Sequence, residues 1–349
     1  MNAPALSVVV PCYNEQEVLP QFHARVTAAM EGIGLPFEIV YVNDGSRDGT
    51  LALMLGMQAE DARVAVLNLS RNFGKEIALT AGLDHAGCDQ AVVVIDADLQ
   101  DPPEVIPALV AAWRQGFDVA YAQRRVRHGE SWLKRTTAAG FYRVMQRLGG
   151  RVQLPQDTGD FRLMSRRALD ALLTLREQHR FMKGLFAWVG FPSVAVPYDR
   201  APRAAGTTKW NWWKLWNLSL EGITSFTVGP LKIASYLGLG IAFFAAVFIL
   251  QLLGRTILFG NPVAGYPSLM AAVLFLGGVQ MMMLGVIGEY LGRVFNETKG
   301  RPLYIVERHI ASGRVERHVA SGRVERHGAG GRTERHGAGG QTPAQGHGA

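Results

Sequence analysis

The sequence predicts an α/β domain followed by two membrane-spanning helices, and three observations lead to this expectation. Short apolar stretches alternate with helical stretches over roughly the first 120 residues. Polar residues directly follow each apolar stretch, and two long uncharged stretches come much later in the chain. Short, continuously apolar strands that alternate with helices indicate a parallel sheet covered on both faces.

Four stretches rich in Val, Ile and Leu are the predicted strands, at residues 6–10, 37–43, 64–69 and 91–95. The predicted helices follow them, at about residues 17–32, 48–60, 74–86 and 103–116. In an open α/β sheet, ligands bind at the carboxyl ends of the strands. The polar residues after each strand are therefore expected to face one crevice. Residues 123–228 are less regular and rich in Arg, Lys and Trp, and we expect them to complete the sheet and carry the acceptor side of the site.

Two stretches near the C-terminus are long enough to span a bilayer. Residues 233–253 and 266–288 contain 21 and 23 residues without a charge. At about 1.5 Å per residue, each covers the ~30 Å hydrocarbon core. Buried core helices are the alternative, but buried helices of this length rarely lack every charge. Lys232 and Arg293 flank the outer ends. The positive-inside rule then places the catalytic domain and both termini in the cytoplasm, on a multi-pass protein of the inner membrane.

The last 40 residues have a different composition. Glu-Arg-His recurs at a spacing of nine residues from Glu307 to His336, with small residues between the copies. This pattern favours a disordered tail over residues 310–349, after a juxtamembrane segment at 296–309, and the alternative is a tail that binds a metal or anionic lipid. Gly277, Gly278 and other glycines of the second span allow helix packing and hence a homo-oligomer.

Charge and cysteine content narrow the function classes. The net charge of +7 permits an anionic partner such as a phosphate or a lipid headgroup, without choosing among them. The two cysteines form no Cys-x-x-Cys pair, which argues against a disulfide framework and against a cysteine zinc site. There is also no N-terminal stretch with the features of a signal peptide, so we expect the front of the chain to stay in the cytoplasm.

Asp96-Ala97-Asp98 is the strongest candidate for a metal site. The two carboxylates follow the end of a predicted strand, and Gln100 can add a carbonyl oxygen. Mg²⁺ and Mn²⁺ prefer such oxygen ligands and leave positions for substrate phosphates. An Asp-x-Asp pair also occurs by chance, and Asp101 or a neighbouring acid can instead cap the next helix.

Asp44 follows the second predicted strand and can accept hydrogen bonds from a base or a ribose. Asp48 more plausibly caps the helix that begins near Thr50. Neither a Walker loop nor a Gly-x-Gly-x-x-Gly turn is present, so we expect a metal rather than a glycine-rich loop to hold the phosphates.

Eight ordered blocks resemble family 2 glycosyltransferases of the polyprenyl-phosphate type, the group of dolichol-phosphate mannose synthase and bacterial undecaprenyl-phosphate glucosyl transferases. The matching blocks are VVVPCYNEQE (8–17), VNDGSRDGT (42–50), LSRNFGKEIALTAG (69–82), IDADLQDPPE (95–104), DTGDFRLMSRRAL (157–169), RFMKGLFAWVG (180–190), AGTTKWNWWKLW (205–216) and GVIGEYLGRVF (285–295). The two spans make the bacterial branch the more similar one.

The resemblance implies a GT-A type fold and an inverting transfer from a nucleotide sugar to a lipid phosphate. It implies a nucleotide-sugar site at Pro11, Tyr13, Glu15, Asp44, Lys75 and Asp96, with Lys75 near the base. The implied metal and diphosphate residues are Asp96, Asp98 and Gln100. Asp160 or Asp157 is placed near the reacting centre, and Arg203 and Lys209 near the acceptor phosphate.

The chemistry is consistent with these groups. Cleavage of the donor builds negative charge on the diphosphate, which Mg²⁺ or Mn²⁺ at Asp96 and Asp98 would stabilise. A lipid phosphate is already ionised, so Asp160 is needed only to position or deprotonate a monoanionic acceptor. Asp160 can also be a structural partner of Arg162 or of another basic residue. Arg124 is a candidate phosphate clamp, or part of a solvated basic run.

The sequence thus predicts four parts. Residues 1–228 form the catalytic domain, including a Trp-rich helix near 208–222 that would lie at the membrane interface, and 229–295 hold the two spans before the juxtamembrane segment and tail. The expected partners are a UDP- or GDP-linked sugar, with UDP-glucose first, undecaprenyl phosphate and the bilayer, but no nucleic acid. The alternative function is a non-catalytic, membrane-bound nucleotide-sugar sensor.

Overall fold

A computed structural model describes residues 3–125, 158–199, 229–259, 265–311 and 314–316. In these ranges one mixed sheet has the strand order β7-β5-β6-β4-β1-β2-β3-β8-β9. The strands are β1 (Leu6–Cys12), β2 (Phe37–Asn43), β3 (Val64–Leu69), β4 (Ala91–Val94), β5 (Val119–Arg124), β6 (Thr158–Ser165), β7 (Ser193–Tyr198), β8 (Val306–Ala311) and β9 (Arg314–Glu316). The helices are α1 (Leu19–Glu31), α2 (Thr50–Glu60), α3 (Lys75–His85), the 3-10 turn η1 (Pro103–Val105), α4 (Ile106–Arg114), α6 (Arg166–Leu173), α7 (Met182–Trp188), α9 (Gly229–Phe259) and α10 (Tyr266–Thr298).

The four predicted strands are confirmed, and they form the parallel centre of the sheet. β1 pairs in parallel with β2 and β4, and β2 pairs in parallel with β3. Cys12 lies opposite Asn43, and Val9 lies opposite Val94. The carboxyl ends of these strands therefore meet at one edge, as the positions of the polar residues predict.

The expectation of a parallel sheet is only partly right, because β6 and β8 are antiparallel to their neighbours. β6 lies between β4 and β5 and runs antiparallel to both. All eight residues of β6 are buried, although Asp160 and Arg162 are charged. Two charged residues inside an eight-residue stretch conceal the apolar pattern by which a buried strand is recognised in a sequence.

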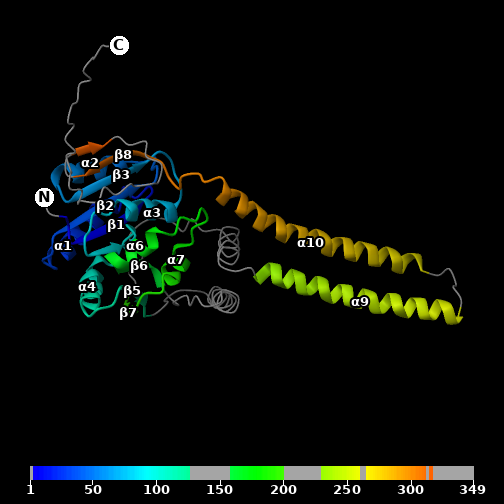
Figure 1. Cartoon of the computed structure of the whole chain (residues 1–349). Coiled ribbons are helices and arrows are strands. Elements are labelled where there is room, and N and C mark those ends of the chain that lie inside the picture. Colours follow the sequence, from blue (N-terminus) through cyan, green and yellow to red (C-terminus); the bar gives the residue numbers. More distant parts are fainter. Residues whose placement is uncertain (1–2, 126–157, 200–228, 260–264, 312–313, 317–349) are drawn as a thin grey trace, which may run out of the picture.

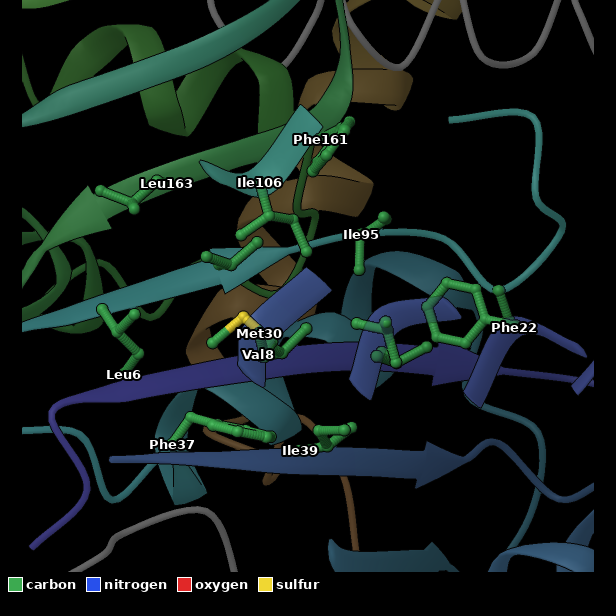
Figure 2. Close-up of a cluster of buried hydrophobic side chains, with 14 of the residues drawn as sticks. Leu6, Val8, Phe22, Met30, Phe37, Ile39, Ile95, Ile106, Phe161 and Leu163 are labelled. Carbon is green, nitrogen blue, oxygen red and sulfur yellow. The ribbon is translucent and has the colours of Figure 1, made fainter. Parts of the chain in front are cut away.

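The core lies on both faces of this sheet. In Figure 2, side chains from β1 and β2, such as Val8 and Ile39, pack with Phe22 and Met30 of α1. The opposite face of β1 contributes Val9 to a second cluster. Alternate strand residues thus point to opposite layers, and a fully buried aliphatic side chain stabilises the fold by about 1.5–3 kcal/mol.

Helix α3 packs closely on the second face. A Cβ atom added to Gly82 would lie 2.3 Å from the Val9 Cγ1 atom. The side chains of Ala78 and Leu79 are fully buried in the same helix. This packing fixes the position of α3, whose first residue is Lys75.

Helices α9 and α10 lie side by side and extend away from the sheet domain (Figure 1). The predicted spans 233–253 and 266–288 fall within these helices. Within the described residues, the segment Phe275–Thr298 is the one that meets a length and hydropathy criterion for crossing a membrane. Large apolar side chains are exposed on both helices, among them Phe244, Leu250, Leu269 and Met281.

The C-terminal boundaries differ from the expected ones. Helix α10 continues to Thr298, and the chain then returns to the sheet, where β8 pairs antiparallel with β3. Val306 and Ile310 are buried in this strand. The segment expected to be disordered from residue 310 therefore begins inside a strand. The first Glu-Arg-His copy is flanked by Val306 and Ile310, and both of these apolar side chains are buried. Residues 317–349 lie outside the described residues.

Side-chain contacts also hold the returning segment in place. The Tyr304 hydroxyl donates to the Asp84 carboxylate of α3 at 2.7 Å, and Arg176 pairs with the same carboxylate at 2.7 Å. The Ser70 backbone N–H donates to the Ile305 carbonyl at 3.0 Å. The chain after α10 is therefore part of the sheet domain.

We predict that deleting the residues after Arg308 destabilises the protein, whereas deleting those after Glu316 does not. The shorter chain loses the buried Ile310 and half of β8. The expected loss is about 2–4 kcal/mol of unfolding free energy, against less than about 0.5 kcal/mol for the longer chain. Thermal unfolding of the two purified truncations tests this, and equal midpoints would show that β8 is dispensable.

Candidate active site

The candidate site lies where β4 and β6 reach the carboxyl edge of the parallel strands. The antiparallel register pairs Ala91 with Ser165 and Val94 with Arg162. Continued by two residues, this register places Asp96 beside Asp160. The sequence indicated each aspartate separately, and the pairing of β4 with β6 explains why they meet.

Lys75 joins these two carboxylates. Its Nζ atom is 2.7 Å from Asp96 Oδ2 and 2.6 Å from Asp160 Oδ2. The Asp160 side chain is 8% exposed and the Asp96 side chain 28% exposed, whereas Lys75 is 45% exposed. The resemblance implied a place near the base for Lys75, but in this structure its ammonium group lies between the two acids.

The charges of Lys75, Asp96 and Asp160 shift one another's pKa values. Burial opposes ionisation of Asp160, but the Lys75 ammonium outweighs it and holds the Asp160 pKa below its usual range. Burial also opposes the Lys75 charge, yet Asp160 and Asp96 keep the Lys75 pKa well above its ordinary value. The Asp96 pKa is raised, mainly by burial. Asp160 is therefore ionised at neutral pH, as a positioning group or proton acceptor requires.

Asp98 and Gln100 lie on the loop after β4. The Asp98 Oδ1 atom accepts a hydrogen bond from the Gln100 backbone N–H at 3.1 Å, and the Gln100 side chain is buried. Leu99 between them has φ +57°, a conformation that few apolar residues adopt. The loop thus directs Asp96 and Asp98 to the same edge while burying Leu99.

Asp101 does not cap the following helix. It is buried and accepts a hydrogen bond from the Tyr198 hydroxyl, and Arg124 Nη2 lies 3.9 Å from it. Neither η1 nor α4 has a side-chain N-cap hydrogen bond. This excludes the alternative in which Asp101 serves as a helix cap.

The donor atoms present fit a divalent cation. Asp96 and Asp98 offer carboxylate oxygens from neighbouring positions, and the buried Asp160 Oδ1 atom has no hydrogen-bond partner among the residues that the structure describes. In the described ranges no group of three or more His, Cys, Asp or Glu residues has a metal-binding arrangement. Two carboxylates are sufficient for Mg²⁺ or Mn²⁺ when substrate phosphates and water complete the coordination.

Asp44 fixes the loop that carries Lys75. Its two carboxylate oxygens accept hydrogen bonds from the Phe73 and Gly74 backbone N–H groups at 2.7 and 2.9 Å. Burial raises the Asp44 pKa, and these hydrogen bonds oppose the shift. Gly45 lies against this loop at φ +65°, where a Cβ atom would be 2.6 Å from the Arg71 carbonyl carbon. The role of Asp44 toward a nucleoside stays a prediction.

Pro11, Tyr13 and Glu15 lie at the end of β1 and in the loop after it. Pro11 is half-buried, and the Tyr13 side chain is exposed. The Glu15 backbone N–H donates to the Thr50 hydroxyl at 2.9 Å, and Asp48 accepts from the Thr50 backbone N–H at 3.1 Å. These contacts bring the β1 and β2 loops together, as a shared nucleoside site requires.

Arg124 approaches the same edge from β5. Its Nε atom donates to the Tyr198 hydroxyl at 3.2 Å. A Cβ atom on Gly159 would lie 3.3 Å from Arg124 Nη2, so the guanidinium group is close to the start of β6. The residues predicted alongside it, Asp157, Arg203 and Lys209, lie outside the described residues, as does the Trp-rich helix at 208–222.

Three further charged residues, Glu76, Lys183 and Arg162, lie close enough to Asp160 for their charges to interact with it. The Glu76 carboxylate accepts a hydrogen bond from the Met182 backbone N–H at 3.3 Å, and burial, together with Asp160, raises the Glu76 pKa to about 7. Burial lowers the pKa of Lys183, which lies close enough to Asp160 for their charges to interact. Burial also lowers the Arg162 pKa to about 10. Glu76 and Lys183 occur in the quoted sequence blocks, but no spacing relates them to Asp160.

Arg162 does not pair with the Asp160 carboxylate. Its guanidinium group donates to the backbone carbonyls of Gly159 and Asp160, at 3.0 and 3.2 Å, and stacks 3.7 Å from the Phe186 ring centroid. Arg162 is therefore not the partner of this carboxylate, whereas Lys75 is, so both the structural role beside a basic residue and the role at the reacting centre stay predictions. The Asp160 carboxylate instead faces Lys75.

Comparison with known proteins relates this arrangement to a family. The family model "Glycosyl transferase family 2" matches residues 7–173, and "GtrB C-terminal hairpin" matches residues 229–294. An uncharacterised glycosyltransferase of Synechocystis sp. is 52% identical over 86% of this chain and 94% of its own length. A prophage bactoprenol glucosyl transferase homolog of Escherichia coli is 48% identical, over 87% and 98%.

Two further comparisons are with another curated relative and with a solved structure. A bactoprenol glucosyl transferase of Shigella phage SfII is 46% identical over 87% of this chain and 97% of its own length. Among solved structures, glucosyl-3-phosphoglycerate synthase of Mycobacterium tuberculosis with Mn²⁺, UDP and phosphoglyceric acid has a TM-score of 0.45 at 20% identity, over 63% of this chain and 76% of that one. The identities over almost the full length of the curated relatives show that this chain belongs to glycosyl transferase family 2, and within it to the polyprenyl-phosphate glycosyl transferases that the sequence blocks resemble.

Proposed function

We propose that this glycosyltransferase moves glucose from UDP-glucose to undecaprenyl phosphate at the cytoplasmic face of the membrane, with inversion at the anomeric carbon. The choice of glucose and of the lipid rests on the relatives named bactoprenol glucosyl transferase. The main observation in support of a catalytic site is that Lys75 contacts both Asp96 and Asp160 at the carboxyl edge of the sheet.

The proposed reaction is a single displacement. An oxygen of the lipid phosphate forms a bond to the anomeric carbon while the bond from that carbon to the diphosphate breaks, and UDP leaves with the electron pair. Asp160, ionised beside Lys75, positions the acceptor or takes the proton of a monoanionic phosphate. When bound, Mg²⁺ or Mn²⁺ at Asp96 and Asp98 supplies positive charge for the leaving diphosphate.

The long helices support a membrane location for the acceptor. We propose that α9 and α10 cross the bilayer as a hairpin, with both chain termini in the cytoplasm. Their exposed apolar side chains, including Phe244 and Leu269, are consistent with contact to lipid, and the family model of a C-terminal hairpin covers the same residues. We propose that Arg124, which lies at the sheet edge, binds the acceptor phosphate.

A transfer assay tests the proposal and separates the donors. Purified full-length protein is incubated with undecaprenyl phosphate, Mg²⁺ or Mn²⁺, and one of a panel of labelled nucleotide sugars, and lipid-linked product is measured. We expect the highest rate with UDP-glucose. A higher rate with GDP-mannose or UDP-N-acetylglucosamine would show that the donor is not UDP-glucose. Binding of nucleotide sugars without turnover would favour the sensor alternative.

We predict that Asp98→Ala lowers the transfer rate at least about 100-fold, because the leaving diphosphate loses its preorganised positive charge. The half-buried position of Asp98 on a loop predicts that the variant folds, with a near-normal circular dichroism spectrum. Asp89→Ala is the matched control, since Asp89 is an exposed acid at the opposite end of β4. Normal transfer by Asp98→Ala would refute the metal assignment.

We predict that Glu76→Gln stabilises the protein at pH 8 and not at pH 4.5. The folded state holds the Glu76 proton with a pKa of about 7, above the ordinary value of 4.5. The wild-type protein therefore loses stability as the pH rises through this window, and the uncharged amide avoids that loss, by about 2 kcal/mol at pH 8. Thermal unfolding at both pH values checks this, with the exposed Glu60→Gln as control. An equal gain at both values would contradict it.

A further inference from the structure

The position of the Lys75 ammonium group has a consequence for cation binding. Its Nζ atom is within hydrogen-bond distance of one oxygen of Asp96 and one of Asp160. Asp96 is also the first carboxylate of the Asp-x-Asp pair to which a divalent cation is assigned. In this structure the same carboxylate therefore already has a cationic partner from the protein itself.

The surrounding fold holds Lys75 in this place. Asp44 binds the two backbone N–H groups immediately before Lys75, those of Phe73 and Gly74. Gly82, two turns further along α3, packs against Val9 with no room for a Cβ atom. The backbone at the start of α3 is thus held in place, which keeps the Lys75 side chain within reach of both carboxylates.

A lysine ammonium and a divalent cation compete for such a site. Both are compact charges that seek carboxylate oxygens, and they repel each other at short distance. Removal of the ammonium, in turn, leaves Asp96 and the buried Asp160 without the positive charge that contacts both of them in this structure. The carboxylate pair then attracts an external cation more strongly than it does in the presence of Lys75.

We propose that Lys75 is a built-in counter-cation that competes with the divalent metal for Asp96, so that the metal binds tightly only together with the donor nucleotide. The donor diphosphate offers the displaced ammonium group a new anionic partner. This inference rests on the proposed function, because it assumes a metal-dependent nucleotide-sugar donor. It makes Lys75 a positioning residue that couples metal binding to donor binding.

Lys75 contacts both carboxylates directly, whereas two other described basic residues near Asp160 make different contacts. Arg162 uses its guanidinium group for backbone carbonyls and the Phe186 ring. Lys183 interacts with the Asp160 charge, but in the described part of the chain it makes no ion pair with Asp96. Lys183 therefore provides a matched control, a lysine near the same carboxylates without the direct contact.

The test measures Mn²⁺ binding to purified full-length protein by electron paramagnetic resonance, first without nucleotide. Lys75→Met should bind Mn²⁺ about tenfold or more tightly than the wild type, the effect of losing an ion pair worth about 1.4 kcal/mol. Lys75→Arg keeps the charge and should bind like the wild type, and Lys183→Met should change the affinity less than about threefold. Equal or weaker binding by Lys75→Met, or tighter binding by both methionine variants alike, would overturn the proposal.

The second arm adds UDP. In the wild type, UDP should raise the Mn²⁺ affinity, and in Lys75→Met this increase should be at least about threefold smaller because the competing ammonium is absent. An equal increase in both proteins would overturn the coupling role. If UDP does not bind to either protein, the proposed function fails, while the nucleotide-free comparison still decides whether Lys75 competes with the metal.

A thermal measurement provides an independent readout. Lys75→Met leaves two neighbouring carboxylates without their counter-charge, so its unfolding midpoint without metal should be lower than that of the wild type. Because a ligand stabilises the state that binds it, Mn²⁺ should raise the midpoint of Lys75→Met more than that of the wild type. An equal or smaller increase would argue against competition, even if the variant is less stable overall.

Discussion

Two carboxylates at the carboxyl edge of the sheet share one ammonium group, and much of the surrounding structure serves to hold that contact. Asp96 and Asp160 come from strands that pair antiparallel, and Lys75 comes from the first turn of α3. Like charges this close require a counter-charge, because burial makes an unpaired carboxylate costly. The Lys75 ammonium is that counter-charge. The packing of α3 on β1 and the hydrogen bonds of Asp44 to the preceding loop hold Lys75 in position.

The same edge brings together the other parts of a transferase. The loops after β1 and β2 are joined through Glu15, Thr50 and Asp48, at the surface where we propose that the nucleoside binds. Asp98, two residues after Asp96, accepts a hydrogen bond from the Gln100 backbone N–H in the loop after β4. From the other side, β5 presents Arg124 close to the start of β6. A donor and an anionic acceptor can therefore approach Asp160 from different elements.

The sequence predicted those parts of the molecule that depend on local patterns. Four apolar stretches identified the parallel strands, and the polar residues after them identified the edge where Asp96, Asp160 and Lys75 meet. The position of β6 was not predictable in this way, because Asp160 and Arg162 interrupt its apolar pattern and its pairing with β4 is a long-range contact. Strand β8 was missed for a related reason, since its Glu-Arg-His triplet resembles the repeats that follow it. The interaction of Glu76 with Asp160, and the place of Lys75, likewise depend on how α3 packs on the sheet.

The account requires that this site performs one displacement, and the configuration of the product tests that requirement most directly. UDP-glucose labelled with ¹³C at the anomeric carbon is incubated with the purified protein and undecaprenyl phosphate, and the lipid product is examined by nuclear magnetic resonance. The account predicts a glucosyl phosphate lipid whose anomeric configuration is inverted relative to the donor. A lipid product with retained configuration, or labelled glucose released only as free sugar, would contradict it.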